Sequence, residues 1–164
     1  MDKSKSFYNA KNKLAKYDRA TFDLMSLAAE FNDIYNENFT LPNMVYLLRK
    51  SFKELLTHAK VLGENKMCSN TDPSSGFCII SSYLIYSLTG GDNVWELQGT
   101  SLHWWLYHKQ TGTIFDITHT QFSNKDIQEI YKLGRPVKQL QTDETFYDVL
   151  QDKMHKLAQR AGLE

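Results

Sequence analysis

The segment from Ser101 to Thr118 constrains the fold more than any other part of the chain. Two runs of strand-forming residues, Ser101–His108 and Thr113–Thr118, stand on either side of Lys109-Gln110-Thr111-Gly112. Strand-forming residues that are separated by a short turn ending in glycine predict a β-hairpin. A third strand-like run, Asn93 to Gln98, precedes the hairpin, so we expect an antiparallel sheet.

Helical patterns flank these strands on both sides. Before the strands, apolar residues recur at spacings of three and four over three segments, Asn9 to Tyr35, Asn43 to Gly63 and Phe77 to Leu88. After the strands, two further helices are expected, over Asn124–Lys132 and from about Thr145 to Arg160. The order of helices, strands and helices predicts an α+β fold, with extra N-terminal helices and a C-terminal helix.

The length and the charge balance predict one soluble, cytoplasmic domain. The 164 residues include 19 Lys and Arg against 19 Asp and Glu, without a block of five like charges, so no nucleic-acid partner is expected. The longest apolar stretches fall short of the roughly 18 residues that span a bilayer, so no membrane partner is expected. Within the domain we distinguish an N-terminal helical segment, residues 1–64, from a core, residues 65–164. The oligomeric state stays open.

Cys78 stands in the first turn of the helix expected from Phe77 to Leu88. The unpaired N–H groups and the positive end of the dipole at a helix start stabilise a thiolate. The same N–H groups can hold the oxyanion of a tetrahedral intermediate. The position therefore predicts a nucleophilic cysteine, and the alternative is a small side chain buried on the inner face of the helix.

The hairpin places a histidine and a carboxylate on one face of the sheet. A turn centred on Gln110-Thr111 pairs residues whose numbers sum to 221, which makes His103 and Asp116 diagonal neighbours, roughly 7 Å apart. At that separation a carboxylate can orient an imidazole. A turn of three residues would move Asp116 to the opposite face. Trp105 shares the face of His103, and we expect Trp105 and Phe77 to contact the substrate.

The chain order Cys78, His103, Asp116 is the order of a thiol triad in papain-like and transglutaminase-like folds. Further segments carry a resemblance to one family: Gly76-Phe77-Cys78, Gly90-Gly91, His103-Trp104-Trp105, Asp116-Ile117-Thr118, Gln121-Phe122, and a Gly134-Arg135-Pro136 break before the last helix. Over roughly Asn70 to Ala161, the sequence resembles the YunG-like family. The resemblance implies a papain-like core, a triad of Cys78, His103 and Asp116, and structural or supporting places for Thr118, Gln121 and Phe122.

Two positions depart from the pattern of that family. Its members usually carry a polar residue, often Gln, just before the cysteine, and this chain has Phe77 there. They also carry Asn after the run of His, an aromatic residue and Trp, where this chain has Leu106. Both replacements remove a side-chain donor that could serve an oxyanion or a substrate.

Together these residues predict a thiol enzyme that acts on an amide or ester bond of a protein or peptide. Peptidase, deamidase and acyltransferase activities all fit, because the residues do not choose between water and an amine as acceptor. The alternative is a non-catalytic protein-binding domain with a vestigial triad, encoded by a phage or mobile element. We expect no cofactor and no metal site, since Cys68, His108 and His119 lack the C-x-x-C or H-x-x-x-H spacing of metal ligands.

Overall fold

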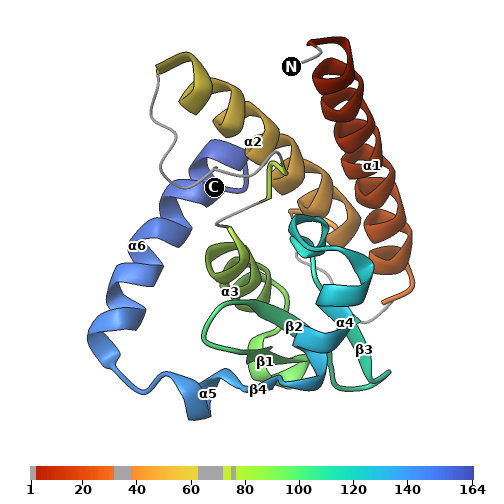
Figure 1. Ribbon diagram of the computed structural model, residues 1–164. Coiled ribbons are helices and arrows are strands. Elements are labelled where there is room, and N and C mark those ends of the chain that lie inside the picture. Colours follow the sequence, from red (N-terminus) through yellow and green to blue (C-terminus); the bar gives the residue numbers. More distant parts are fainter. Residues whose placement is uncertain (1–2, 32–37, 63–71, 75–76) are drawn as a thin grey trace.

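The computed structural model describes residues 3–31, 38–62, 72–74 and 77–164, with side chains at 14–31, 38–55, 72–74 and 77–164 (Figure 1). Two long helices, α1 (Lys3–Ala29) and α2 (Leu41–Leu62), precede α3 (Cys78–Leu88) and a short helix η1 (Gly91–Asn93). Strands β1 (Trp95–Gly99), β2 (Trp104–His108) and β3 (Thr113–Phe115) follow. The remaining elements are η2 (His119–Gln121), α4 (Asn124–Lys132), β4 (Arg135–Pro136), α5 (Val137–Leu140) and α6 (Glu144–Ala161).

The strands form one antiparallel sheet in the order β3-β2-β1-β4, which confirms the predicted α+β class. The fourth strand was not expected. Gly99 of β1 pairs with Arg135, and Gln98 pairs with Pro136, in the segment that the sequence indicated as a break between helices. A strand of two residues is too short to show an alternation of apolar and polar residues, so its sequence carries no strand signal.

The register of the hairpin is the predicted one. Leu106 pairs with Phe115, Tyr107 with Ile114 and His108 with Thr113, so the numbers of each pair sum to 221. Strand β3 ends at Phe115, three residues before the expected end. It ends there because the backbone N–H of Thr118 turns back to the side chain of Asp116, and η2 follows directly.

The helices lie mainly where the periodicity predicted them. Helix α4 has the predicted bounds, and α6 begins after Asp143, whose carboxylate caps the N–H of Thr145 at 2.9 Å. Helix α2 begins at Leu41 with Pro42 in its first turn, two residues before the expected start. Residues 32–35 of the first expected helix, and most of residues 65–76 between the second and third expected helices, lie outside the described residues. In the described part of the chain, no helix combines the length and the apolar character needed to cross a membrane.

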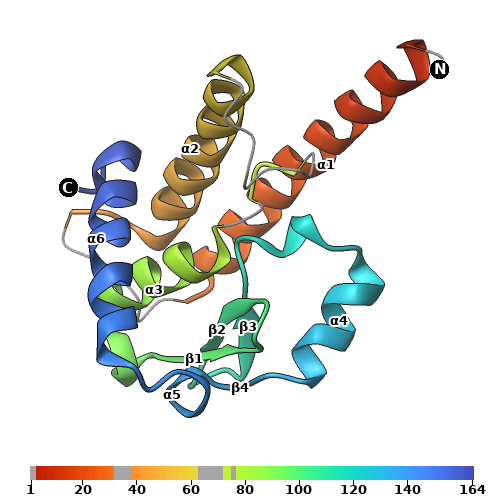
Figure 2. The same ribbon diagram turned by 60° about the vertical axis from the view of Figure 1, so that its left-hand side comes forward.

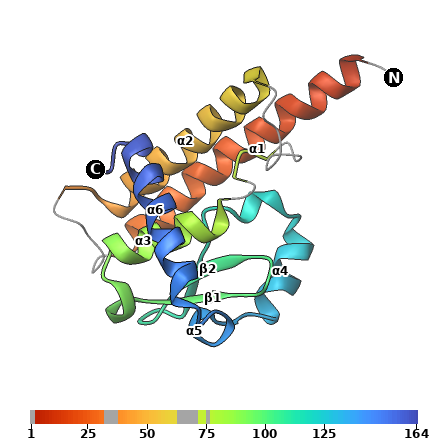
Figure 3. The same cartoon turned by 90° about the vertical axis from the view of Figure 1, so that its left-hand side faces the viewer.

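Helix α3 lies between the sheet and helix α6, while α1 and α2 pack side by side over them (Figures 2 and 3). Buried apolar side chains from all these elements form one continuous cluster that includes Leu24, Val45, Leu84, Leu106 and Leu157. In the described residues, the N-terminal helices thus pack on the rest of the chain. Burial of this apolar area is the main force that holds the layers together.

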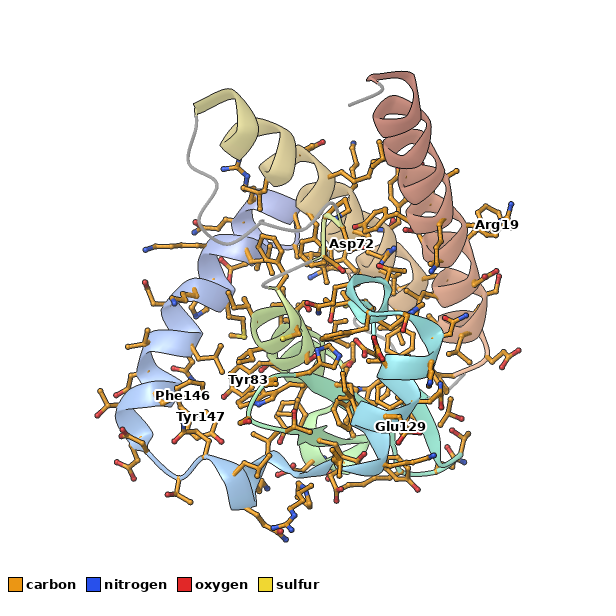
Figure 4. The ribbon with its side chains drawn as sticks, viewed as in Figure 1. Arg19, Asp72, Tyr83, Glu129, Phe146 and Tyr147 are labelled. Atoms are coloured by element: carbon orange, nitrogen blue, oxygen red, sulfur yellow. The ribbon has the colours of Figure 1, made fainter. Side chains whose placement is uncertain are left out.

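Aromatic side chains attach the start of α6 to α3 and the sheet. Figure 4 shows Tyr83 of α3 beside Phe146 and Tyr147 of α6. The ring centroids of Tyr83 and Tyr147 are 6.1 Å apart, and those of Trp104 and Phe146 are 5.8 Å apart. These contacts hold α6 against the helix that begins with Cys78.

Candidate functional site

Cys78 is the first residue of α3, as the sequence predicted, and its side chain is 7% exposed. Phe77 occupies the N-cap position and makes no capping hydrogen bond through its side chain. Its ring instead stacks on Phe52 of α2, with centroids 4.5 Å apart. Phe77 therefore offers no side chain that competes for the N–H groups of the first turn of α3.

His103 lies just before β2, is fully buried, and meets Asp116 as the hairpin register predicted. Its Nε2 is 2.6 Å from Oδ2 of Asp116. A carboxylate is an acceptor, so Nε2 carries the hydrogen of this bond. The other ring nitrogen, Nδ1, is also buried and makes no hydrogen bond of normal geometry with any of the described residues. In the neutral imidazole this nitrogen has a free lone pair, which is the requirement for a general base.

Asp116 is held by donors on both of its carboxylate oxygens. Its Oδ1 accepts from the backbone N–H and the hydroxyl of Thr118, both at 3.1 Å. Its Oδ2 accepts from His103 and, at 2.8 Å, from the hydroxyl of Tyr131 in α4. Thr118 thus occupies the supporting place that the family resemblance implied. Sequence reasoning missed Tyr131. The one sequence feature that pointed to it is its position in α4, one helical turn after the buried Ile127.

The electrostatics of the buried pair favour a charged imidazolium beside a carboxylate. Burial by itself lowers the pKa of His103, but the hydrogen bond to Asp116 and the interaction with the Cys78 thiol outweigh burial and raise the pKa to about 9. For Asp116, burial acts to raise the pKa, and the hydrogen bond and charge of His103 bring the pKa below its usual value. The thiol of Cys78 thus interacts electrostatically with the imidazole of His103.

Aromatic rings enclose the imidazole. The ring centroid of Phe122 is 5.0 Å from that of His103, and the centroid of Trp105 is 5.7 Å away. Trp105 is fully buried, and its Nε1 donates to the side-chain oxygen of Gln98 at 3.1 Å. The indole therefore supports the imidazole from within the protein, and the contact of Trp105 or Phe77 with a substrate stays a prediction.

The segment before Cys78 is joined to the segment after Asp116. Asp72, labelled in Figure 4, accepts from the backbone N–H of Ser74 at 2.8 Å and also binds its hydroxyl. The same hydroxyl lies 3.3 Å from the carbonyl oxygen of Thr118. This link helps to hold Cys78 and Asp116 in fixed positions relative to each other.

The other candidate residues lie in or beside the short helix η2 or in the core. His119 is half-buried. Burial lowers its pKa, and the charge of Asp116 acts in the opposite direction. Gln121 lies in the same short helix, and its buried Nε2 finds no partner among the described residues. His108 stacks on Phe31 in the core, and Cys68 lies outside the described residues.

Comparison with known protein families places most of the chain in one of them. Residues 43–159 match the family model described as YunG protein. The match begins in α2, well before the start expected near Asn70, and it leaves out α1. Comparisons with curated proteins and with solved structures give no match.

Proposed function

The chain belongs to the YunG protein family, and we propose that it is a thiol enzyme that forms an acyl intermediate on Cys78. The proposal includes a papain-like arrangement, in which a helix that begins with cysteine packs on an antiparallel sheet whose hairpin supplies histidine and aspartate. Its substrate is an amide or ester of a protein or peptide. The observation that supports it best is the 2.6 Å contact between Nε2 of His103 and Asp116, which leaves Nδ1 as the ring nitrogen that can exchange a proton with Cys78 or the substrate.

In the first step, the sulfur of Cys78 attacks the carbonyl carbon of the substrate, and the C=O electron pair moves to oxygen. The N–H groups at the start of α3 are the donors that we assign to this oxyanion, because the N-cap residue Phe77 does not cap them with its side chain. The tetrahedral intermediate collapses to a thioester. The leaving amine or alcohol takes the proton that His103 holds on Nδ1.

In the second step, water or an amine attacks the thioester. Nδ1 of the now neutral His103 accepts the proton of the attacking group, and the sulfur of Cys78 leaves as thiolate. Asp116 stays ionised throughout, keeps the Nε2–H tautomer and stabilises the imidazolium that forms. Water as acceptor gives a peptidase or deamidase, and an amine gives an acyltransferase.

The proposal is tested by alkylating the folded protein with iodoacetamide at about pH 6 to 7 and mapping the product by mass spectrometry. We expect Cys78 to react faster than Cys68, because a thiolate beside an imidazolium persists at this pH. His103→Ala should slow the reaction of Cys78 by about tenfold or more, since the imidazolium is lost. Far-UV circular dichroism of each variant checks that the fold is kept.

Cys68 is the internal control, and the Cys78→Ser variant isolates its signal. Slow and equal alkylation of both cysteines, unchanged by His103→Ala, would refute a thiolate mechanism. It would instead favour the second candidate, a non-catalytic protein-binding domain. That candidate draws support from Phe77, whose ring packs on Phe52 at a position where members of the family usually carry a polar residue.

A further inference from the structure

The hydroxyl of Tyr131 and the imidazole of His103 share one carboxylate oxygen, Oδ2 of Asp116. We propose that Tyr131 is a positioning residue that acts through Asp116, because its hydroxyl takes part of the negative charge that the carboxylate offers to His103. This inference rests on the proposed function, because it assigns Tyr131 a role in the same proton transfer. It goes beyond the proposed function because it names the group that weakens the attraction between Asp116 and the imidazolium of His103.

The phenol is rigidly placed. The ring of Tyr131 packs edge-to-face on Trp105, with centroids 5.0 Å apart, and Trp105 in turn lies beside His103. At the end of α4, the backbone N–H of Gly134 donates to the carbonyl oxygen of Tyr131 at 3.1 Å. These contacts restrict the Tyr131 side chain to few rotamers. Formation of its hydrogen bond to Asp116 therefore costs little side-chain conformational entropy.

The two oxygens of Asp116 receive different donors, which gives Tyr131 a specific effect. Thr118 supplies both of its donors to Oδ1, the oxygen that does not contact the imidazole. Tyr131 donates to Oδ2, where it competes directly with His103 for the same negative charge. A neutral donor on that oxygen weakens the attraction of the carboxylate for the proton of the imidazolium.

Few other ionisable groups act on this pair. His103 is influenced by Cys78 of α3 and by Asp116. Asp116 is held by His103 and Tyr131, and Arg49 and His119 are coupled to it by charge alone. Removing the Tyr131 hydroxyl therefore changes one hydrogen bond at Oδ2 and leaves the charged groups of the site as they are.

The test is an NMR titration of the His103 ring in the protein and in its Tyr131→Phe variant. The titration midpoint of His103 should rise by roughly 0.5 to 1 pH unit in the variant, because Asp116 then holds the imidazolium alone. The matched control is Tyr147→Phe, which removes a hydroxyl that donates to the carbonyl oxygen of Gln141 at 3.0 Å. That variant should leave the titration of His103 unchanged.

A midpoint that stays the same or falls in Tyr131→Phe would overturn the inference, whatever happens to the melting temperature. Should this variant fail to fold, 3,5-difluorotyrosine incorporated at position 131 keeps the ring and makes a stronger donor, so the midpoint should fall. A rise in the His103 midpoint of the protein with 3,5-difluorotyrosine would also refute the inference. The titration needs no reactive thiol, so its failure is distinct from a failure of Cys78 to alkylate.

Discussion

Arg49 of α2 donates a hydrogen bond from Nη1 to the carbonyl oxygen of Ile117, the residue that follows Asp116. The guanidinium is fully buried and also donates to the hydroxyl of Thr21 at 2.6 Å and to the carbonyl oxygen of Tyr17 at 2.8 Å. Its central carbon lies 3.7 Å from the centroid of the Tyr17 ring. The Arg49 side chain thus joins both N-terminal helices to the segment that carries Asp116.

The first prediction concerns this buried arginine. Arg49→Met should lower the free energy of unfolding by about 2 to 4 kcal/mol, because the buried carbonyl groups of Tyr17 and Ile117 lose their donor. Urea denaturation measures the change. Lys53→Met is the control, since Lys53 pairs with Asp18 at 2.9 Å on the surface and should contribute less than about 1 kcal/mol. Equal effects of the two substitutions would show that Arg49 does not hold the layers together.

The second prediction concerns pH. The pKa of His103 is raised from 6.5 to about 9, so its stabilising effect is complete below about pH 6.5 and is lost as the pH rises through about 9. The pKa of Asp116 is lowered, so its stabilising effect is present above its ordinary pKa and is lost as the pH falls through the folded value. The pair should therefore stabilise the fold most between about pH 5 and 7.

Asp116→Asn provides the reference for this measurement. The difference in unfolding free energy between the protein and this variant should be largest near pH 6 and should shrink by up to about 3 kcal/mol toward pH 10. Thermal or urea unfolding at a series of pH values measures it. A difference that is constant over this range would mean that the two side chains do not form an ion pair.

The third prediction concerns the contact between Gly134 and Trp105. A Cβ atom at position 134 would stand 2.3 Å from Cζ2 of the indole, so Gly134→Ala should destabilise the fold by about 1 to 3 kcal/mol. Trp105→Phe in the same chain should recover part of this loss, because the smaller ring makes room. A double-mutant cycle of melting temperatures tests the coupling, and strictly additive effects would contradict it.

The sequence predicted the parts of the site that local patterns determine. Gly112 adopts φ +69°, and a residue type that tolerates this conformation at the turn helped to set the register between His103 and Asp116. Helical periodicity likewise put Cys78 at the start of α3. The proximity of His103 and Asp116 follows from the hairpin register alone, so it could be predicted without any knowledge of the tertiary structure.

The residues that were missed act over long sequence separations. Arg49 and Ile117 are 68 positions apart, and no local pattern relates them. One signal was present, because Arg49 interrupts the apolar stripe of α2 between Val45 and Phe52, where a charge requires buried partners. Tyr131 had no comparable signal, since an aromatic residue on the apolar face of a helix is ordinary core.

Helix α1 supplies two of the acceptors of Arg49 and lies outside the residues 43–159 that the family shares. A buried guanidinium is tolerated only where such acceptors exist, so the arginine and the first helix depend on each other. Relatives without a comparable helix should carry an uncharged residue at this position. The side chain found at this position in a relative should therefore indicate whether that relative carries a helix comparable to α1.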